Sequence, residues 1–457
     1  MNRLNPFRAT LFDPARSGDL GAVLCPPYDV VSQQDQYRLY LRSPCNVIRL
    51  ELGQDLPGDD QATNRYTRAN EQLAAWLAEG VLREDESPAF YLYVQEWEGG
   101  GSRTSFYAAV RLAEWDKGEV IPHEQTLSGP KADRLLLMRH TAANMSPVFG
   151  LYADPSGVVR QILAEAQASE PDLAAEQGAE RHRLWRIARW DDVAAIQEAL
   201  SNQPIYIADG HHRYETALAY RDECRERQGA FTGEEPWNSV LMCLADVAEP
   251  GLEVLPTHRL VKAKDLDAAA LVARLGEVFA VEERPAPDTA ARIAATDRLL
   301  GEMKELNEAG RHALGLALPG EARVLLLTLR EDPRELLSGF GRSPAWRELD
   351  VAILHYLVIL EMLGIPEGEW KGGKHLVYTR DHKEVLAGLE SGEFQAGFFL
   401  NPTPVAQVVD VARAGDVMPQ KSTFFYPKLP TGLVLHRLGE VPALGERPVP
   451  APTGNGG

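Results

Sequence analysis

The sequence predicts an α/β (or α+β) protein built around a mixed sheet, and three observations lead to this class. Strand-like and helix-like segments alternate along most of the 457 residues, as they do in α/β proteins. Residues 90–96 and 104–114 are strand-like and are joined by Gly99-Gly100-Gly101, which indicates an antiparallel hairpin and therefore a mixed sheet. Residues 205–208 form a short apolar segment that leads through a tight turn into a helical pattern.

The elements follow from periodicity and from the turn residues between segments. The expected strands are 90–96, 104–114, 148–152, 185–188, 205–208, 239–246, 324–329, 375–378 and 396–400. The expected helices are one ending near residues 77–80, those at 158–168, 191–200, 351–364 and 380–390, the helix after residue 210 and a last one beyond residue 400. Residues 123–144 are expected to form a polar segment.

A chain of this length exceeds what one hydrophobic core usually holds, so we expect several domains. They are an N-terminal segment at 1–87, a core at 88–263, a helix-rich lobe or insertion at 264–345 and a C-terminal α/β region at 346–457. The Pro- and Gly-rich sequence after Gly439 predicts a flexible tail.

Composition restricts the partners and the compartment. The formal net charge of −19 disfavours nucleic acid as a partner, because a phosphate backbone needs a basic surface, although a local basic pocket for a small anion is compatible with it. The four cysteines are scattered without metal-binding spacing, which suggests a reducing, cytoplasmic compartment. No apolar signal core follows Met1, and the longest apolar segment, 351–364, is too short to span a bilayer, so no membrane contact is expected.

The turn after residues 205–208 is the strongest candidate site. Asp209 is a good N-cap residue, and Gly210 allows the backbone to turn closely beneath a ligand. His211, His212 and Arg213 then fall in the first turn of the helix. A helix N-terminus favours anions, and the added cationic side chains predict a phosphate-holding site.

Two other interpretations of this turn are a zinc site and a capped helix. A zinc site is disfavoured, because neighbouring helical residues point about 100° apart and no Cys pair or His-x-x-x-His lies nearby. A capped helix with a solvated first turn is the structural alternative. The position at the carboxyl end of a strand favours the functional interpretation, since α/β sheets usually bind ligands there.

A second candidate segment begins at His123 and carries Glu124, Lys131 and Arg134. A carboxylate beside cations suits a general base for phosphoryl transfer, which accepts the hydroxyl proton while cations neutralise the transferred group. The alternative is a solvated loop with ordinary ion pairs. Further candidate contacts to substrate or phosphate, each more typical of structure when taken singly, are His258, Arg259, Lys421, Ser422 and Thr423.

Four motifs in this order resemble a bacterial family of long-unknown function that is related to the SerK-type free-serine kinases. They are Cys25-Pro26-Pro27-Tyr28-Asp29-Val30, His123-Glu124-x-Thr126, Ala208-Asp209-Gly210-His211-His212-Arg213-Tyr214-Glu215-Thr216-Ala217 and Lys421-Ser422-Thr423-x-Phe425-Tyr426-Pro427-Lys428. The resemblance implies a ParB/sulfiredoxin-like nucleotide-binding core at 88–263. It also implies phosphorylation of free L-serine to O-phospho-L-serine by ADP or ATP. Glu124 would correspond to the catalytic glutamate, and residues 209–213 to the phosphate-binding turn.

The leading expectation is therefore a small-molecule phosphotransferase that uses ADP or ATP with Mg²⁺, for which Asp209 is a candidate ligand and no ligand is certain. Phosphorylation of another hydroxyl compound or nucleotide hydrolysis is the alternative enzyme activity. A nucleotide-binding regulatory protein is the alternative from another class. Glu124 distinguishes these alternatives, because a binding protein needs the phosphate turn but no base. The oligomeric state is left open.

Overall fold

The computed structural model describes residues 3–124, 128–370 and 373–439, and it divides into two compact units. Unit 1 combines residues 1–120, 126–251 and 427–457, and unit 2 combines residues 121–125 and 252–426. Thr126 of the second motif and the tail after Gly439 lie outside the described residues. Unit 2 therefore holds the predicted lobe at 264–345 together with most of the predicted C-terminal region, whereas the four-segment division itself stays a prediction.

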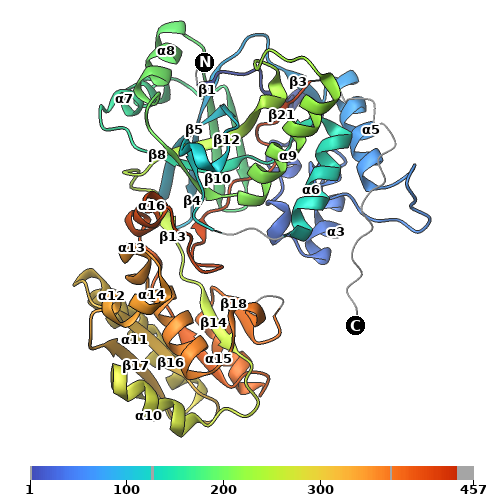
Figure 1. Ribbon diagram of the computed structural model, residues 1–457. Helices are drawn as coiled ribbons and strands as arrows, with labels where there is room; N and C mark the ends of the chain where they lie inside the picture. The colour runs from blue at the N-terminus through green and yellow to red at the C-terminus, as the bar shows by residue number, and fades with distance from the viewer. Residues whose placement is uncertain (1–2, 125–127, 371–372, 440–457) are drawn as a thin grey trace. The chain divides into compact units, whose positions relative to one another are not determined.

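Unit 1 is organised around a large mixed sheet (Figure 1). Its strands follow the order β11-β8-β12-β5-β4-β10-β9, with β6 next to β11 and β1 beside β5. The β8–β12 pair is parallel, whereas the β4–β5 hairpin and the β11–β8 pair are antiparallel. The strands are β1 (Leu4–Asn5), β4 (Phe90–Trp97), β5 (Gly101–Arg111), β6 (Val120–Ile121), β8 (Val148–Tyr152), β9 (Leu173–Gln177), β10 (Glu180–Ile187), β11 (Ile205–Asp209) and β12 (Ser239–Asp246).

The two faces of this sheet differ in chemistry because successive strand residues point to opposite sides. On β4, Phe90, Leu92 and Val94 belong to the main hydrophobic core, which α7, α8 and α9 also supply. The alternate positions on the same strand include Tyr93 and Gln95, which are fully buried and hydrogen-bonded. The second face is thus a buried polar layer.

The helices of unit 1 come from two parts of the sequence, residues 14–78 and residues 128–228. Figure 1 shows α6 and α9 side by side, with α5 packed next to α6. Two small strand pairs, β2 (Thr10–Phe12) with β3 (Leu82–Glu84) and β7 (Ala143–Asn144) with β21 (His436–Arg437), join distant parts of the chain. The helices are α1 (Pro14–Ser17), α2 (Leu20–Val23), η1 (Tyr28–Val30), α3 (Gln33–Arg42), α4 (Ile48–Glu51), α5 (Arg65–Ala78), α6 (Ser128–Thr141), α7 (Val158–Gln167), α8 (Trp190–Ala199) and α9 (His211–Gln228).

Unit 2 has its own sheet, in the order β15-β17-β16-β19-β14-β18, with antiparallel neighbours throughout. Its strands are β13 (Glu253–Val254), β14 (His258–Val261), β15 (Phe279–Pro285), β16 (Ala313–Ala317), β17 (Arg323–Leu329), β18 (Leu376–Thr379), β19 (Ala396–Phe399) and β20 (Phe425–Tyr426). Its helices are α10 (Ala268–Val278), α11 (Thr289–Glu308), α12 (Pro333–Leu336), α13 (Pro344–Arg347), α14 (Asp350–Ala352), the π-helix η5 (Ile353–Met362), α15 (His382–Glu390) and α16 (Val405–Arg413).

The predicted α/β class with a mixed sheet and additional α/β parts is confirmed, and so are the hairpin and the strand-to-helix transition at residue 210. Three details differ from the expectations. Residues 128–141 form helix α6, and the lobe contains β15 and β16 besides β17. The segment 351–364 is largely a π-helix, because packing of nearly every side chain in a core overrides the usual periodicity. The ParB/sulfiredoxin-like description stays a prediction.

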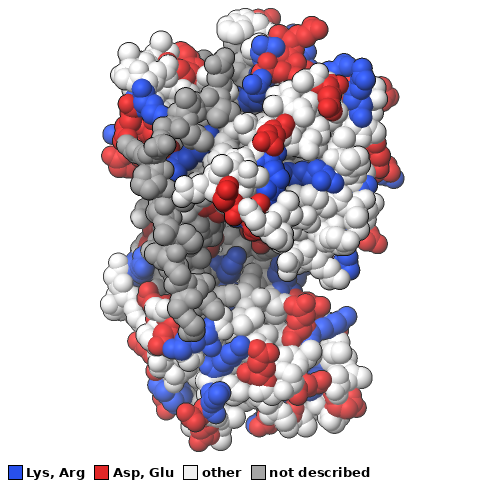
Figure 2. Space-filling model, turned by 90° about the vertical axis from the view of Figure 1, so that its right-hand side faces the viewer, with Lys and Arg blue, Asp and Glu red and all other residues white. Residues whose placement is uncertain are grey.

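On the face drawn in Figure 2, acidic and basic side chains of the described residues are interspersed. None of the helices in the described ranges combines the length and apolar character that crossing a bilayer requires.

Candidate functional site

The β11–α9 turn has the backbone shape that the sequence predicts, but a different cap. Gly210 adopts φ +93°, and a Cβ placed there would lie 2.9 Å from Nε of Arg213. Glycine is therefore required both for the left-handed conformation and for the close approach of the arginine. Helix α9 begins at His211 with Gly210 as its N-cap, and no side chain caps it. The expectation that Asp209 caps the helix was wrong, because Asp209 is still part of β11 and its carboxylate binds two cations.

Asp209 is the centre of a charged cluster at this turn. Nη2 of Arg213 donates to Oδ2 of Asp209 at 2.5 Å, and the ammonium of Lys428 donates to Oδ1. Burial by itself raises the pKa of Asp209, but the charges of Lys428 and Arg213 outweigh it and hold the pKa well below its ordinary value. Two cations therefore share one carboxylate beside the positive end of the α9 dipole.

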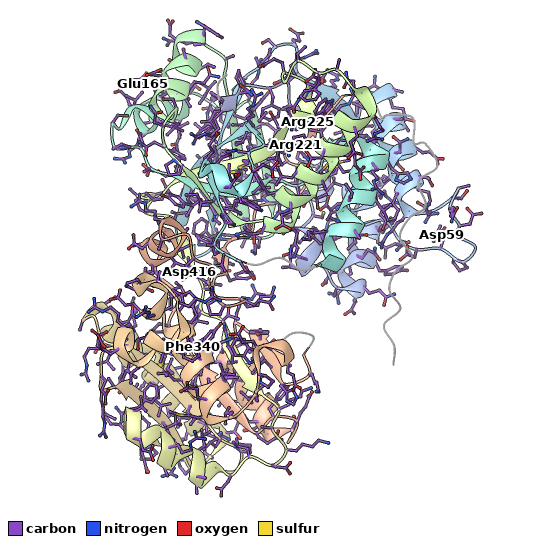
Figure 3. The ribbon with its side chains drawn as sticks, viewed as in Figure 1. Asp59, Glu165, Arg221, Arg225, Phe340 and Asp416 are labelled. Atoms are coloured by element: carbon purple, nitrogen blue, oxygen red, sulfur yellow. The ribbon has the colours of Figure 1, made fainter. Side chains whose placement is uncertain are left out.

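The second arm of the Arg213 guanidinium donates to the carbonyl oxygen of Pro147, in the loop before β8. Arg213 is thus held at both ends of its planar fork. Helix α9 itself is anchored further along: Arg221 donates to Leu112, and Arg225 donates to the side chain of Asn238 at 2.9 Å (Figure 3). These contacts hold helix α9 in place within unit 1.

Two of the predicted cations are used in other ion pairs. Lys131 lies 2.7 Å from Glu215, which joins α6 to α9. Arg134 is buried and pairs with Glu51 at 3.2 Å and with Asp133 at 2.5 Å. Both residues therefore hold helices together in this structure.

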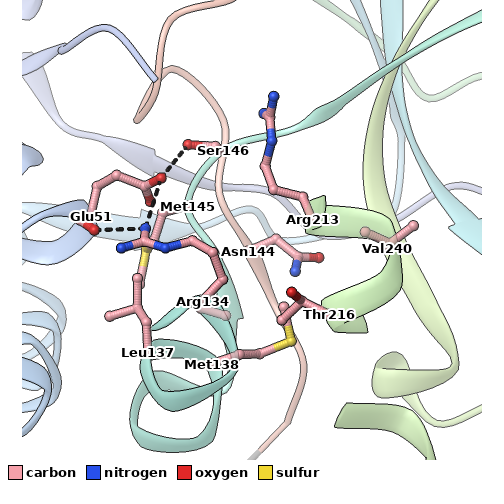
Figure 4. A pocket seen from close by; sticks show the side chains of 11 residues that line it. Glu51, Arg134, Leu137, Met138, Asn144, Met145, Ser146, Arg213, Thr216 and Val240 are labelled. Carbon is pink, nitrogen blue, oxygen red and sulfur yellow. Dashed lines mark hydrogen bonds and ion pairs between the residues drawn. The ribbon is translucent and has the colours of Figure 1, made fainter. Parts of the chain in front are cut away.

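Arg134, Glu51 and Arg213 line a pocket in unit 1 (Figure 4). Oε1 of Glu51 also accepts a hydrogen bond from Ser146 at 2.9 Å, so the acidic residue is doubly engaged. The guanidinium of Arg134 lies 4.2 Å from the ring centroid of Tyr28, which belongs to the first motif. Burial raises the pKa of Tyr28 to about 12 against the opposing charges of Arg213 and Arg134.

A second polar cluster lies in unit 2 around Glu124. The carboxylate of Glu124 accepts a hydrogen bond of 3.4 Å from the backbone N–H of Lys421. The neighbouring His123 is buried and lies within hydrogen-bonding distance of Thr423, at 3.1 Å. The structure thus brings Glu124 together with the fourth motif, 297 positions later in the chain.

Arg259 contacts this cluster through the backbone of Lys421. It is 1% exposed and donates to the carbonyl oxygen of Lys421 at 3.0 Å and to Nε2 of His355 at 3.1 Å. Burial lowers the pKa of Arg259 to about 10, while the charges of Tyr378 and Glu124 act in the opposite direction. Lys421 itself adopts φ +56°, a conformation that lysine rarely adopts, so the surrounding contacts hold a strained loop in place.

The remaining predicted residues have structural partners. Ser422 donates to the carbonyl oxygen of Pro419, and its own carbonyl accepts from Thr403 at 2.9 Å. His258 accepts a hydrogen bond from the N–H of Leu400 at 3.2 Å, and burial lowers its pKa to about 3. His258 is therefore a neutral core residue next to Arg259 rather than a cation.

Sequence reasoning missed three residues that build the unit 1 site. Lys428 ends the fourth motif and was not assigned to the site, although its place in that motif was a usable signal. Tyr28 is part of the first motif, but the motif alone does not assign it to this site. Glu51 carried no signal at all, because its importance depends on burial against Arg134.

No group of three or more His, Cys, Asp and Glu side chains arranged for a metal occurs within residues 3–124, 128–370 and 373–439. Both oxygens of Asp209 are engaged by cations, so this carboxylate does not fit the role of a metal ligand here. Cations around a helix N-terminus instead fit a phosphate or another small anion.

The fold and the two clusters define an α/β protein with a preformed, cation-rich helix N-terminus. The chain belongs to the family described as "Protein of unknown function (DUF1015)", whose model matches residues 4–352, and the expected membership of a family of unknown function is confirmed. No curated protein matches the sequence.

Several solved structures are similar at low identity. A conserved hypothetical protein from Pyrococcus furiosus has 14% identity and a TM-score of 0.32, covering 72% of this chain and 93% of its own. A free serine kinase in complex with AMP has 15% identity and a TM-score of 0.32, covering 70% and 86%. SbnI with a C-terminal truncation, from Staphylococcus aureus, has 10% identity and a TM-score of 0.30, covering 70% and 85%.

Proposed function

We propose that this protein is a small-molecule phosphotransferase that phosphorylates free L-serine to O-phospho-L-serine with ADP or ATP. The nature of the acceptor comes from the motif resemblance, and the nature of the chemistry is supported by the site. The observation that carries the proposal is the pair of cations, Arg213 and Lys428, held on Asp209 at the N-terminus of α9.

This pair suits a phosphate for an electrostatic reason. A transferred phosphoryl group carries negative charge on its oxygens throughout the reaction, so fixed cations and N–H dipoles stabilise it without reorganising. Arg213 and Lys428 are both held at this turn by Asp209, and the α9 N-terminus adds a partial positive charge. The terminal phosphates of ADP or ATP are the ligands that this site would hold.

Glu124 is the proposed general base. In the reaction the serine hydroxyl oxygen forms a bond to the terminal phosphorus, and the bond from that phosphorus to the bridging oxygen of the nucleotide breaks. The hydroxyl proton passes to the Glu124 carboxylate, and AMP leaves when ADP is the donor or ADP when ATP is the donor. The hydrogen bond from Lys421 N–H orients the carboxylate, and Arg259 holds the Lys421 loop.

Mg²⁺ would reach the site on the nucleotide, since Asp209 does not fit as its ligand. The metal would offset charge on the donor phosphates, as it does in other phosphoryl transfers. His211 and His212, at the first positions of α9, are proposed to lie beside the bound phosphates.

The direct test is to incubate the purified protein with ADP or ATP, Mg²⁺ and each of a panel of amino acids and other hydroxyl compounds. We expect O-phosphoserine to form together with AMP or ADP in equal amounts. A phosphorylated product from another compound would replace serine as the acceptor. Nucleotide binding with no phosphorylated product, or nucleotide cleavage alone, would contradict the proposal in favour of a regulatory protein or a hydrolase.

A further inference from the structure

The buried polar face of the unit 1 sheet contains a charged residue that the proposed reaction does not use. Arg103 on β5 is 0% exposed, and its guanidinium lies 4.7 Å from the ring centroid of Phe149. Phe149 is the residue paired with Asp209 across β8 and β11. Burying an arginine is costly unless its hydrogen bonds are well made, so its partners indicate what the residue is for.

The partners of Arg103 lead to the segment that carries Lys428. Nη2 of Arg103 donates to the carbonyl oxygen of Pro427 at 2.9 Å and to Oε1 of Gln95 at 2.5 Å. Nε2 of Gln95 donates to the carbonyl oxygen of Lys428 at 3.2 Å and to Glu180 at 2.7 Å. The two side chains therefore bind the carbonyl groups immediately before and after the Cα of Lys428.

We propose that Gln95 and Arg103 are positioning residues that clamp the backbone of Lys428 so that its ammonium is held on Asp209 beside the α9 N-terminus. The donors and acceptors around Gln95 allow only one orientation of its side-chain amide. Arginine only donates, so the Gln95 oxygen must face Arg103. A carbonyl and a carboxylate only accept, so the Gln95 amide nitrogen must face Lys428 and Glu180. Burial lowers the pKa of Arg103, and the charge of Glu180 is one of several that act in the opposite direction.

The position of Lys428 does not depend on what the protein binds, whereas the effect on phosphate binding rests on the proposed function. Two measurements separate these claims.

Gln95→Glu keeps the size of the side chain but places an oxygen against the Lys428 carbonyl and Glu180. Gln95→Met removes the same hydrogen bonds without adding charge, in case the first variant is unstable. Gln161→Glu is the matched control, because Gln161 donates to Glu165 on the exposed face of α7.

The first measurement is the rate at which an amine-reactive acylating reagent labels Lys428, followed residue by residue by mass spectrometry. Lys428 is 15% exposed in this structure. We expect its labelling to accelerate by about two- to tenfold in either Gln95 variant, the effect of losing one hydrogen bond between neutral groups. Other lysines, and Lys428 in Gln161→Glu, should react at the original rate. Unchanged labelling of Lys428 in folded Gln95→Met would overturn the proposal, since a purely structural clamp would lower stability alone.

The second measurement is a double-mutant cycle on pyrophosphate and ADP affinity by calorimetry. Gln95→Met should weaken binding in the parent chain and have no further effect in a Lys428→Met background, because it acts through Lys428. Additive losses would overturn the proposal. If the unmodified protein binds neither pyrophosphate nor ADP, the proposed function fails, and the labelling result still decides whether Gln95 and Arg103 position Lys428.

Discussion

Asp209 and Lys428 form an ion pair although 219 positions separate them in the chain. Arg213, only four positions from Asp209, binds the other oxygen of the same carboxylate. The carboxylate thus fixes one cation from helix α9 and one from the C-terminal segment of unit 1. The arrangement holds two cationic side chains in place at a helix N-terminus, which is the property that a phosphate site needs.

Arg213→Ala should weaken nucleotide binding by ~1.5–3 kcal/mol, the range for a hydrogen bond to a charged group. Binding and rate should fall together, because the charge of Arg213 acts on both the ground state and the transition state. Calorimetric titration with ADP and ATP measures the change. Arg227→Ala, an exposed position on the same helix, is the control. An unchanged affinity in Arg213→Ala would place the nucleotide pocket elsewhere.

Glu124→Gln should lower the phosphorylation rate by roughly 10²–10⁴ while nucleotide affinity stays nearly intact, because the substitution removes only the proton acceptor. Steady-state rates with serine and a separate binding titration give the two quantities. Glu253→Gln, at an exposed site in unit 2, should behave like the unmodified protein. Full turnover per folded molecule in Glu124→Gln would rule out the base.

Gly210→Ala should destabilise the protein for two reasons that a control can separate. A positive φ costs an alanine ~1–2 kcal/mol, and the new methyl group would also displace Arg213. Gly157→Ala has a comparable φ of +71° but nothing within 4 Å of its Cβ, so it should show the backbone cost alone. Urea unfolding and ADP titration should find that only Gly210→Ala also loses nucleotide affinity. Equal effects of both variants on binding would contradict the proposed contact.

The lowered pKa of Asp209 predicts how stability depends on pH. An unfolded aspartate titrates near ~3.9, and the folded pKa of Asp209 lies well below its ordinary value. Its contribution to stability is therefore complete above about pH 4 and is lost as the pH falls through the folded pKa.

Asp209→Asn removes this titration, so the free energy of unfolding should fall less steeply from pH 5 to pH 2.5 than in the parent chain. Urea unfolding across that range measures the slope, with the exposed Asp265→Asn as the control. The same acid slope in Asp209→Asn and in the unmodified protein would show that the cations do not stabilise the folded state through this carboxylate.

The sequence by itself determined the α/β class, the hairpin at Gly99–Gly101 and the strand-to-helix turn at Gly210. These features depend on signals within a few residues of one another, namely strand alternation and glycines where the backbone must turn. Membership of the family also followed from the order of the four motifs. The π-helix η5 was not predicted, because packing in the core overrides local periodicity there, and helix α6 was not predicted either.

Only the tertiary structure decided which charges meet. Lys131 and Arg134, which sequence reasoning placed beside the base, pair with Glu215 and with Glu51 and Asp133. Lys428 instead reaches Asp209, and the buried Arg103 holds it there through Pro427. The partner of a charged side chain is set by strand order and by how the chain returns to a sheet, and a pattern along the sequence carries no record of either. The local turn was therefore predictable, whereas its cations were not.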